Sequence, residues 1–148
     1  MSILAVTHFN NLTWNENVRW RQKEQYKGCI YNSPVQIKNI LQNQIYVIEM
    51  NNEENTISGI GLIYNRLYYD RKYNIYSDKN YNRYTYLGKL WLPRSCIDEY
   101  TLNKLETRLF KGKKHLKRSQ GIVQVPKDVE TMYLEYIDTL WKLCFCKS

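Results

Sequence analysis

Two apolar stretches separated by a short polar turn constrain the fold of this chain more than any other feature. Residues 44–50 and 56–64 are rich in β-branched and aromatic side chains, and the turn between them reads Asn-Asn-Glu-Glu-Asn. This pattern predicts an antiparallel hairpin. The returning strand contains Gly59 and Gly61 on either side of Ile60. Because glycine weakens a strand interior, these positions indicate a bulge, the corner of a barrel, or a close approach by another backbone or a ligand.

The other elements are expected on both sides of this hairpin. Residues 2–9 should form an opening strand buried on both faces, whereas residues 10–31 show so little periodicity that we expect a loop or a loosely helical excursion. We expect a short helix starting at Ser33-Pro34, with Val35, Ile37, Ile40 and Leu41 on its apolar side, and then a tyrosine-rich hairpin over 68–86 that turns at 77–80 and runs on to 90–92. The next element should be a helix capped by Ser95, with Asp98 in a capping box and with Leu102, Leu105 and Leu109 buried. A strand over 121–125 and an amphipathic helix over about 126–146, with Trp141 in the core, should follow. Together they predict one α+β domain over residues 1–148.

The charge balance favours an acidic partner. The chain has 22 Lys and Arg residues against 14 Asp and Glu residues, which gives a net charge of +8. Nucleic acid is the commonest partner of such a protein. The 14 Tyr and 4 Trp residues add aromatic side chains with a polar tip, which can face a ligand as well as a core.

Positive charge is concentrated in residues 111–118, which we call the basic loop. The loop contains no acidic residue, and Gly112 and Gly121 add backbone freedom. Lys and Arg neutralise phosphates and release condensed counterions, so such a loop contributes affinity without reading base sequence. The predicted nucleic-acid-binding residues are Lys111, Lys113, Lys114, His115, Lys117 and Arg118, with Arg83 from the tyrosine-rich segment. The alternative is a solvated loop that maintains solubility.

Three tryptophans are candidates for a base-stacking pocket. Trp14 and Trp20 lie in a polar segment that gives them no periodic reason for burial, and Trp91 follows the tyrosine-rich segment. Aromatic rings stack on any base, and two of them can enclose a cationic methylated base. The alternative for Trp14 and Trp20 is that one or both fill the core from a loop. The tyrosine-rich segment has two readings as well, namely cross-strand packing or phenol hydroxyls that donate to phosphate.

Metal and catalytic chemistry are not indicated. No two cysteines have the two-residue gap of a zinc knuckle, and a metal site would need His8 or His115 to complete it. The cysteines are Cys29, Cys96, Cys144 and Cys146. We expect them to be reduced in an intracellular protein without signal peptide or membrane span. The sequence has no paired carboxylates in a motif, no nucleophile elbow and no phosphate-binding glycine loop, so we expect no enzyme and no cofactor. The alternative is a nuclease or transferase whose acidic residues are dispersed over the fold.

The order of elements around the hairpin resembles a known superfamily. A short helix, a strand, a turn and a strand reading Ser-Gly-Ile-Gly-Leu-Ile, here residues 58–63, are similar to the central hairpin of the PUA-like superfamily, which includes the EVE, ASCH and YTH domains. The resemblance covers about residues 2–125, without the tyrosine-rich segment and the basic loop, and the last helix is an addition. It implies a small mixed β-barrel with flanking helices that flips a nucleotide of RNA, or a modified base of DNA, into an aromatic pocket. Trp14 and Trp20 correspond loosely to pocket positions after the first strand.

Taken together, these patterns predict a non-catalytic protein that binds nucleic acid, with RNA favoured over DNA. We expect it to read a modified nucleotide, such as a methylated base or a cap, by means of an aromatic pocket and the basic loop. The frequent use of Asn, Ile, Lys and Tyr is typical of A/T-rich genomes, including those of many large DNA viruses and some protists. The expected location is intracellular, in the cytoplasm or nucleus of the host for a viral protein. The alternative is a structural or protein-interaction subunit, for example of a viral complex.

Overall fold

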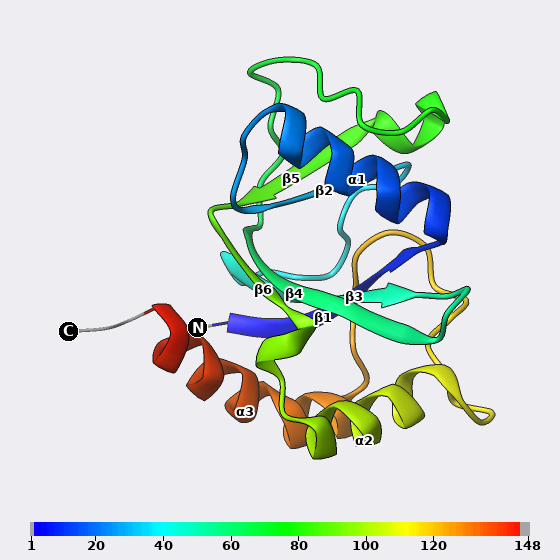
Figure 1. Cartoon of the computed structure of the whole chain (residues 1–148), viewed down its shortest axis with the longest axis vertical. Coiled ribbons are helices and arrows are strands. Elements are labelled where there is room, and N and C mark those ends of the chain that lie inside the picture. Colours follow the sequence, from blue (N-terminus) through cyan, green and yellow to red (C-terminus); the bar gives the residue numbers. More distant parts are fainter. Residues whose placement is uncertain (1, 146–148) are drawn as a thin grey trace.

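The computed structural model describes residues 2–145. In chain order its elements are β1 (Ser2–Phe9), α1 (Asn11–Lys23), β2 (Cys29–Ser33), β3 (Gln44–Asn51), β4 (Thr56–Tyr64), the 3-10 turn η1 (Lys79–Asn82), β5 (Tyr84–Gly88), β6 (Leu90–Pro93), the 3-10 turn η2 (Arg94–Cys96), α2 (Glu99–Phe110), β7 (Val123–Gln124) and α3 (Lys127–Phe145). A five-stranded sheet in the order β6-β4-β3-β1-β7 forms the middle layer, and β2 pairs with β5 in a second sheet (Figure 1). The protein is therefore of mixed α+β class, and over the described residues its sheets are not closed into a barrel.

The predicted hairpin is confirmed as β3 and β4, which pair antiparallel around the turn at residues 52–55. Strand β1 lies beside this hairpin and pairs parallel with β3 and antiparallel with β7. Most of its residues are buried, as expected for a strand that is covered on both faces. The predicted strand at 121–125 is shorter than expected, since only Val123 and Gln124 pair with β1.

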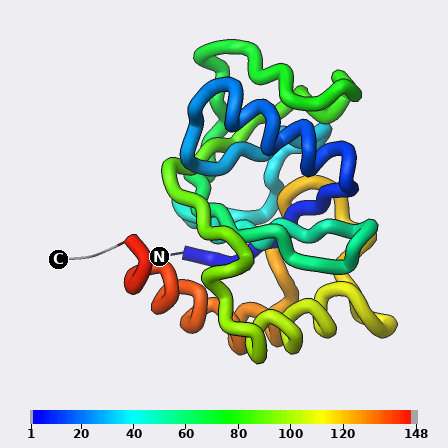
Figure 2. Tube along the Cα trace, in the orientation of Figure 1, coloured from blue at the N-terminus to red at the C-terminus, as the bar shows by residue number. Residues whose placement is uncertain are grey.

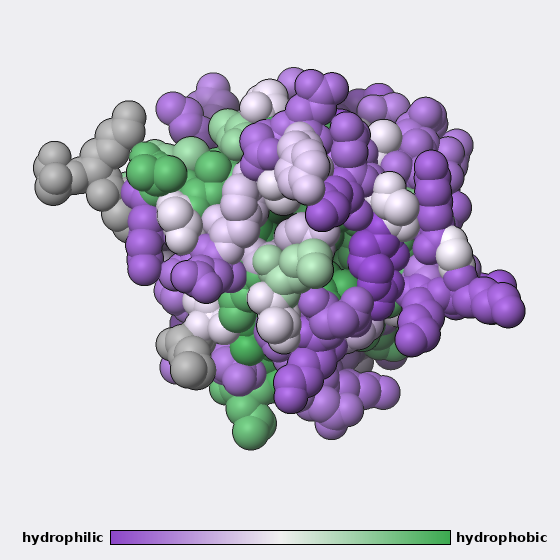
Figure 3. Space-filling model, turned by 90° about the horizontal axis from the view of Figure 1, so that it is seen from below, coloured by the Kyte–Doolittle hydropathy of each residue, from purple (hydrophilic) through white to green (hydrophobic). Residues whose placement is uncertain are grey.

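Helices α2 and α3 cover one face of the five-stranded sheet (Figure 1). The predicted inner face of α2 is confirmed, because Leu102, Leu105 and Leu109 are buried, but Asp98 rather than Ser95 caps this helix. Ser95 instead belongs to η2, and the Asp98 carboxylate accepts a hydrogen bond from the backbone of Thr101. Seen from the side of these helices, the surface is largely hydrophilic with a hydrophobic band in its middle (Figure 3).

The final helix is confirmed over Lys127–Phe145, and it buries Val129, Tyr133, Ile137 and Trp141. Trp141 is therefore a core residue, as predicted. Cys146, at the predicted end of this helix, lies outside the described residues. Among the helices described, none has the length and apolar character needed to cross a membrane.

The opposite face of the sheet is covered by α1, by β2 and β5, and by the segment that leads to η1. Figure 2 shows this segment passing beside α1, where Ser77 N donates to Glu16 and Arg71 pairs with Glu24. Residues 11–23 were expected as a loop or loosely helical, but they form a regular helix capped by Asn10 and Thr13 in a capping box. Its buried position is polar: Asn17 donates to the carbonyl of Ile30 at 2.8 Å and to the Tyr76 hydroxyl at 3.1 Å.

Two further predictions of secondary structure are wrong. The expected helix after Ser33-Pro34 does not form: Ser33 ends β2, residues 34–43 run as irregular chain, and Leu41, expected on the apolar side of the helix, is 93% exposed. The expected tyrosine-rich hairpin is absent from the described fold, because β5 pairs with β2 and residues 66–78 run as irregular chain. Long-range pairing thus overrides the local turn signal at 77–80.

Candidate functional site

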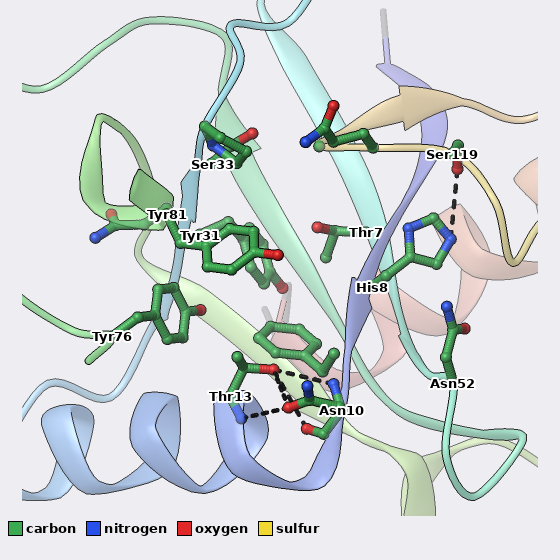
Figure 4. A pocket seen from close by; sticks show the side chains of 15 residues that line it. Thr7, His8, Asn10, Thr13, Tyr31, Ser33, Asn52, Tyr76, Tyr81 and Ser119 are labelled. Carbon is green, nitrogen blue, oxygen red and sulfur yellow. Dashed lines mark hydrogen bonds between the residues drawn. The ribbon is translucent and has the colours of Figure 1, made fainter. Parts of the chain in front are cut away.

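A cavity of about 360 Å³ opens where the ends of β1 and β2, the β3–β4 turn, η1 and the chain after the basic loop meet (Figure 4). Its volume falls at the small end of the range for ligand sites, which is ~300–1,000 Å³. One wall is aromatic and the other is polar, with Thr7 between them (Figure 4). The aromatic wall consists of Phe9, Tyr31, Tyr76 and Tyr81, and the polar wall of His8, Asn52, Ser119, Gln120 and Gly121.

The aromatic wall is assembled from three separate parts of the chain. Phe9 ends β1 and lies 6.3 Å from Tyr31 of β2 between ring centroids, while Tyr76 and Tyr81 meet edge to face at 6.4 Å. Tyr31 and Tyr76 are buried, but Tyr81 is 41% exposed. The cavity therefore has a fixed aromatic floor and an accessible ring at its rim.

The polar wall ties the basic loop to the sheet. His8 Nε2 donates to the carbonyl of Leu116 at 2.6 Å, which leaves Nδ1 as an acceptor. Burial lowers the pKa of His8, although the hydrogen bond to the Leu116 carbonyl acts in the opposite direction. Asn52 Nδ2 donates to the carbonyl of Lys117 at 3.0 Å. These bonds place the end of the basic loop against the cavity mouth.

Behind the aromatic wall lies a buried carboxylate. Glu49 is 1% exposed and accepts hydrogen bonds from the Tyr31 hydroxyl at 2.5 Å and from Trp91 Nε1 at 3.0 Å. Burial raises the pKa of Glu49 to about 7, although the two hydrogen bonds and the charge of Arg21 act in the opposite direction. Tyr31 is thus held in the wall by a group that titrates near neutral pH.

The two glycines of β4 make room for this network. A Cβ at Gly61 would collide with the Tyr31 hydroxyl and with Cys29 Sγ, and one at Gly59 would lie 2.8 Å from the Trp91 ring. The predicted bulge and close approach are both confirmed, since the register with β3 shifts beside Glu49. The approaching groups are the side chains that bind Glu49 and, at Gly59, the backbone of β6.

The three candidate tryptophans do not share one site. Trp14 and Trp91 contact each other with ring centroids 6.4 Å apart, and the Arg21 guanidinium lies 5.3 and 4.8 Å from the two ring centroids. Trp20 instead packs against Tyr26 and Tyr73. None of the three lines the cavity. Since the rings of Trp14 and Trp91 contact each other directly, no base fits between them in this arrangement.

The predicted phosphate-binding residues fall in two places. In the basic loop, Lys111, Lys113, Lys114 and Arg118 are exposed, whereas His115 and Lys117 are partly buried. Arg83 lies apart from the loop, in a second hollow beside η1. Three backbone carbonyls hold the loop in place. Those of Leu116 and Lys117 accept hydrogen bonds from His8 and Asn52, and that of Lys114 accepts one from Arg108 at 2.7 Å. The exposed cations therefore project from a fixed backbone.

The cavity tyrosines were not predicted as site residues. Tyr76 and Tyr81 belong to the tyrosine-rich segment, whose composition was the available signal, while Phe9 and Tyr31 read as ordinary strand residues. Within residues 2–145, no three His, Cys, Asp or Glu side chains gather where they could hold a metal ion. Comparison with protein-family models, with curated proteins and with solved structures found no match for this chain.

Proposed function

We propose that the protein binds nucleic acid without catalysis, and that it takes one nucleotide, modified or unmodified, into the cavity. The observation that carries this proposal is the pairing of an aromatic wall with the end of a basic loop in one cavity of about 360 Å³. A base has an apolar face that stacks on aromatic rings and a charged phosphate that needs cations. The two walls of the cavity supply these two kinds of contact.

In this proposal the accessible ring of Tyr81 stacks on the base, over a floor made by Phe9 and Tyr31. Thr7 and Nδ1 of His8 offer hydrogen-bonding groups for the edge of the base. Lys117 and Arg118 directly precede the wall residue Ser119, so they are the cations best placed for the phosphate. The cage of Trp14, Trp20 and Trp91 is replaced in this proposal by the tyrosine wall.

The arrangement also supports, as part of the proposal, a PUA-like origin of the fold. A parallel β1–β3 pair, the β3–β4 hairpin with its Gly59 and Gly61, and a small second sheet packed against one face are features that a distorted mixed barrel would share. The finer form of the proposed function is that the protein reads a methylated base or a cap, with RNA preferred over DNA.

The test is a titration of short RNA and DNA oligonucleotides, each with and without a methylated base, against the protein and a Tyr81→Ala variant. Loss of one stacking ring should weaken binding by about five- to a hundredfold. Tyr64→Ala is the matched control, because Tyr64 is 37% exposed and lies at the opposite end of the sheet from Phe9. Equal affinities for both variants, or no binding of any oligonucleotide, would exclude the cavity as a nucleotide site.

A protein-interaction role is the second candidate, and the surface of α2 and α3 favours it. Tyr100 of α2 and Met132 and Leu143 of α3 are 70%, 64% and 69% exposed. The surface seen from the side of these helices also shows hydrophobic areas (Figure 3). A contiguous apolar patch that remains exposed on a small domain is typical of contact surfaces. A protein partner at these helices is compatible with a nucleotide in the cavity, which lies on the other side of the sheet.

A further inference from the structure

We propose that the ligand is a single strand of several nucleotides, which leaves the cavity across η1 and continues into a second hollow. This inference rests on the proposed function and specifies its ligand. The second hollow has a volume of about 500 Å³ and is lined by the segment from Tyr68 to Thr85. It lies on the far side of η1 from the cavity, since Tyr81 lines the cavity and Lys79 and Arg83 line the hollow.

The hollow carries positive charge that the protein does not neutralise. Residues 66–83 include five basic and two acidic residues. The lining of the hollow includes four of the basic residues, Arg71, Lys72, Lys79 and Arg83, and neither of the two acids.

Three cations of this segment are available to an outside anion. Lys72, Lys79 and Arg83 are exposed and form no ion pair within the part of the chain that the structure describes. Arg71, in contrast, is paired with Glu24 at 2.7 Å. Three unpaired cations in one hollow suit the phosphates of neighbouring nucleotides.

The wall between the cavity and the hollow is held by hydrogen bonds of Asn82. Asn82 Oδ1 accepts from Asn32 Nδ2 and from Tyr76 N, both at 3.0 Å, and Asn82 Nδ2 donates to the Tyr76 carbonyl at 2.8 Å. Asn32 and Tyr76 line the cavity, whereas Asn82 lines the hollow. One hydrogen-bonded turn thus fixes the spacing of the two sites.

An exposed aromatic ring completes the second site. Tyr69 is 73% exposed and lines the hollow beside Lys72. Stacking on such a ring tolerates any base, because every base has a π-face. The hollow therefore combines phosphate contacts with a stacking ring, which is the usual composition of a single-strand groove.

The test compares fluorescein-labelled eight-nucleotide RNA and DNA strands with nucleoside monophosphates. The variant is K72A/K79A/R83A, and the control K104A/K127A/K142A removes the same charge from α2 and α3. We expect the hollow variant to weaken octamer binding at least about tenfold near 0.1 M salt, to lower the salt slope by about two, and to leave monophosphate binding unchanged. The control variant should lose far less affinity for the octamer.

A second pair of variants tests the stacking ring. Tyr69→Ala should weaken octamer binding by about fivefold or more, whereas Tyr100→Ala, which removes a ring of similar exposure from α2, should not. Octamers that bind no tighter than monophosphates, or hollow and control variants that lose affinity equally, would overturn the extended path while leaving the cavity proposal intact. Binding to anionic vesicles that depends on Lys72, Lys79 and Arg83, without any binding of the octamers, would overturn both the extended path and the cavity proposal.

Discussion

The Tyr31 hydroxyl donates a hydrogen bond of 2.5 Å to the Glu49 carboxylate, and this bond joins the wall of the cavity to a buried titratable group. The second donor to Glu49 is Trp91 Nε1. Both donors reach the carboxylate across the glycines of β4. The geometry of the cavity and the stability of the sheet are therefore linked through one side chain.

The first prediction concerns the pH dependence of stability. The pKa of Glu49 is about 7 in the folded state and near its ordinary value of 4.5 when unfolded. The folded state thus binds this proton more tightly, so the contribution of Glu49 to the free energy of unfolding is greatest below pH 4.5 and is lost as the pH rises to 7, by about 3 kcal/mol at most. Chemical denaturation of wild type and Glu49→Gln across this range measures the effect.

The difference between the two curves isolates Glu49. The pKa of His8 is lowered in the folded state, so its contribution to the free energy of unfolding falls as the pH drops below 6.5, in the opposite direction. Because wild type and Glu49→Gln both retain His8, this contribution cancels in the difference between the two curves. Glu135→Gln on the exposed side of α3 serves as the control and should keep the wild-type slope. Parallel curves for wild type and Glu49→Gln would contradict the prediction.

The second prediction concerns Gly61. A methyl group at this position would press against the Tyr31 hydroxyl and Cys29 Sγ, so Gly61→Ala should lower the free energy of unfolding by about 1–3 kcal/mol. Removing the hydroxyl with Tyr31→Phe should relieve part of this loss. A double-mutant cycle measured by urea denaturation would then show a coupling energy, whereas strictly additive losses would exclude the contact.

The third prediction concerns the basic loop. Replacing Lys113, Lys114, Lys117 and Arg118 together by Ala should lower the salt slope of oligonucleotide binding by up to about three, since each single-strand phosphate contact contributes about 0.7. The melting temperature should change little, because the backbone of the loop is held by carbonyl hydrogen bonds. Exchange of Lys for Arg, and of Arg118 for Lys, retains the charge and should retain the slope. If the Ala variant has the same salt slope as wild type, the phosphates bind at another part of the protein.

The fourth prediction separates Trp14 from the cavity. Its ring packs against Phe9 and Trp91 and lies under Arg21, so Trp14→Ala should cost about 3 kcal/mol of stability. Affinity per folded molecule should change less than in Tyr81→Ala. Thermal melting and binding measured on the same samples distinguish the two effects. If Trp14→Ala has wild-type stability but no longer binds the oligonucleotide, Trp14 belongs to the nucleotide site.

Sequence reasoning succeeded where burial follows a local period. The β3–β4 hairpin and the inner faces of α2 and α3 are built from apolar residues at strand or helix spacing, so the pattern alone predicts them. Helix α1 fails this test, because its inner position Asn17 is polar and gains its partners, Ile30 and Tyr76, only in the folded chain. Polar contacts of this kind have no signature in periodicity.

The cavity could not be predicted from the sequence for a related reason. Its aromatic wall combines Phe9, Tyr31, Tyr76 and Tyr81, which long-range pairing and the Asn82 turn bring together. The glycines of β4 could be recognised as sites of close approach, but not the side chains that approach them. The basic loop was visible because charge accumulates locally, and its position against the cavity depends on His8 and Asn52.

Strand β1 has a consequence for how the chain folds. Ala5 pairs with Val47 on one side and with Gln124 on the other, so β1 gains its second neighbour only after β7, which is much later in the chain, has been synthesised. Contacts between residues so distant in sequence close large loops before they contribute energy, which slows folding. A growing chain that has not yet reached β7 leaves one edge of β1 open, and such an edge is prone to pair with another chain. We expect one edge of β1 to stay open until residues 123–124 have been synthesised, so protection against aggregation depends on the segment that contains β7.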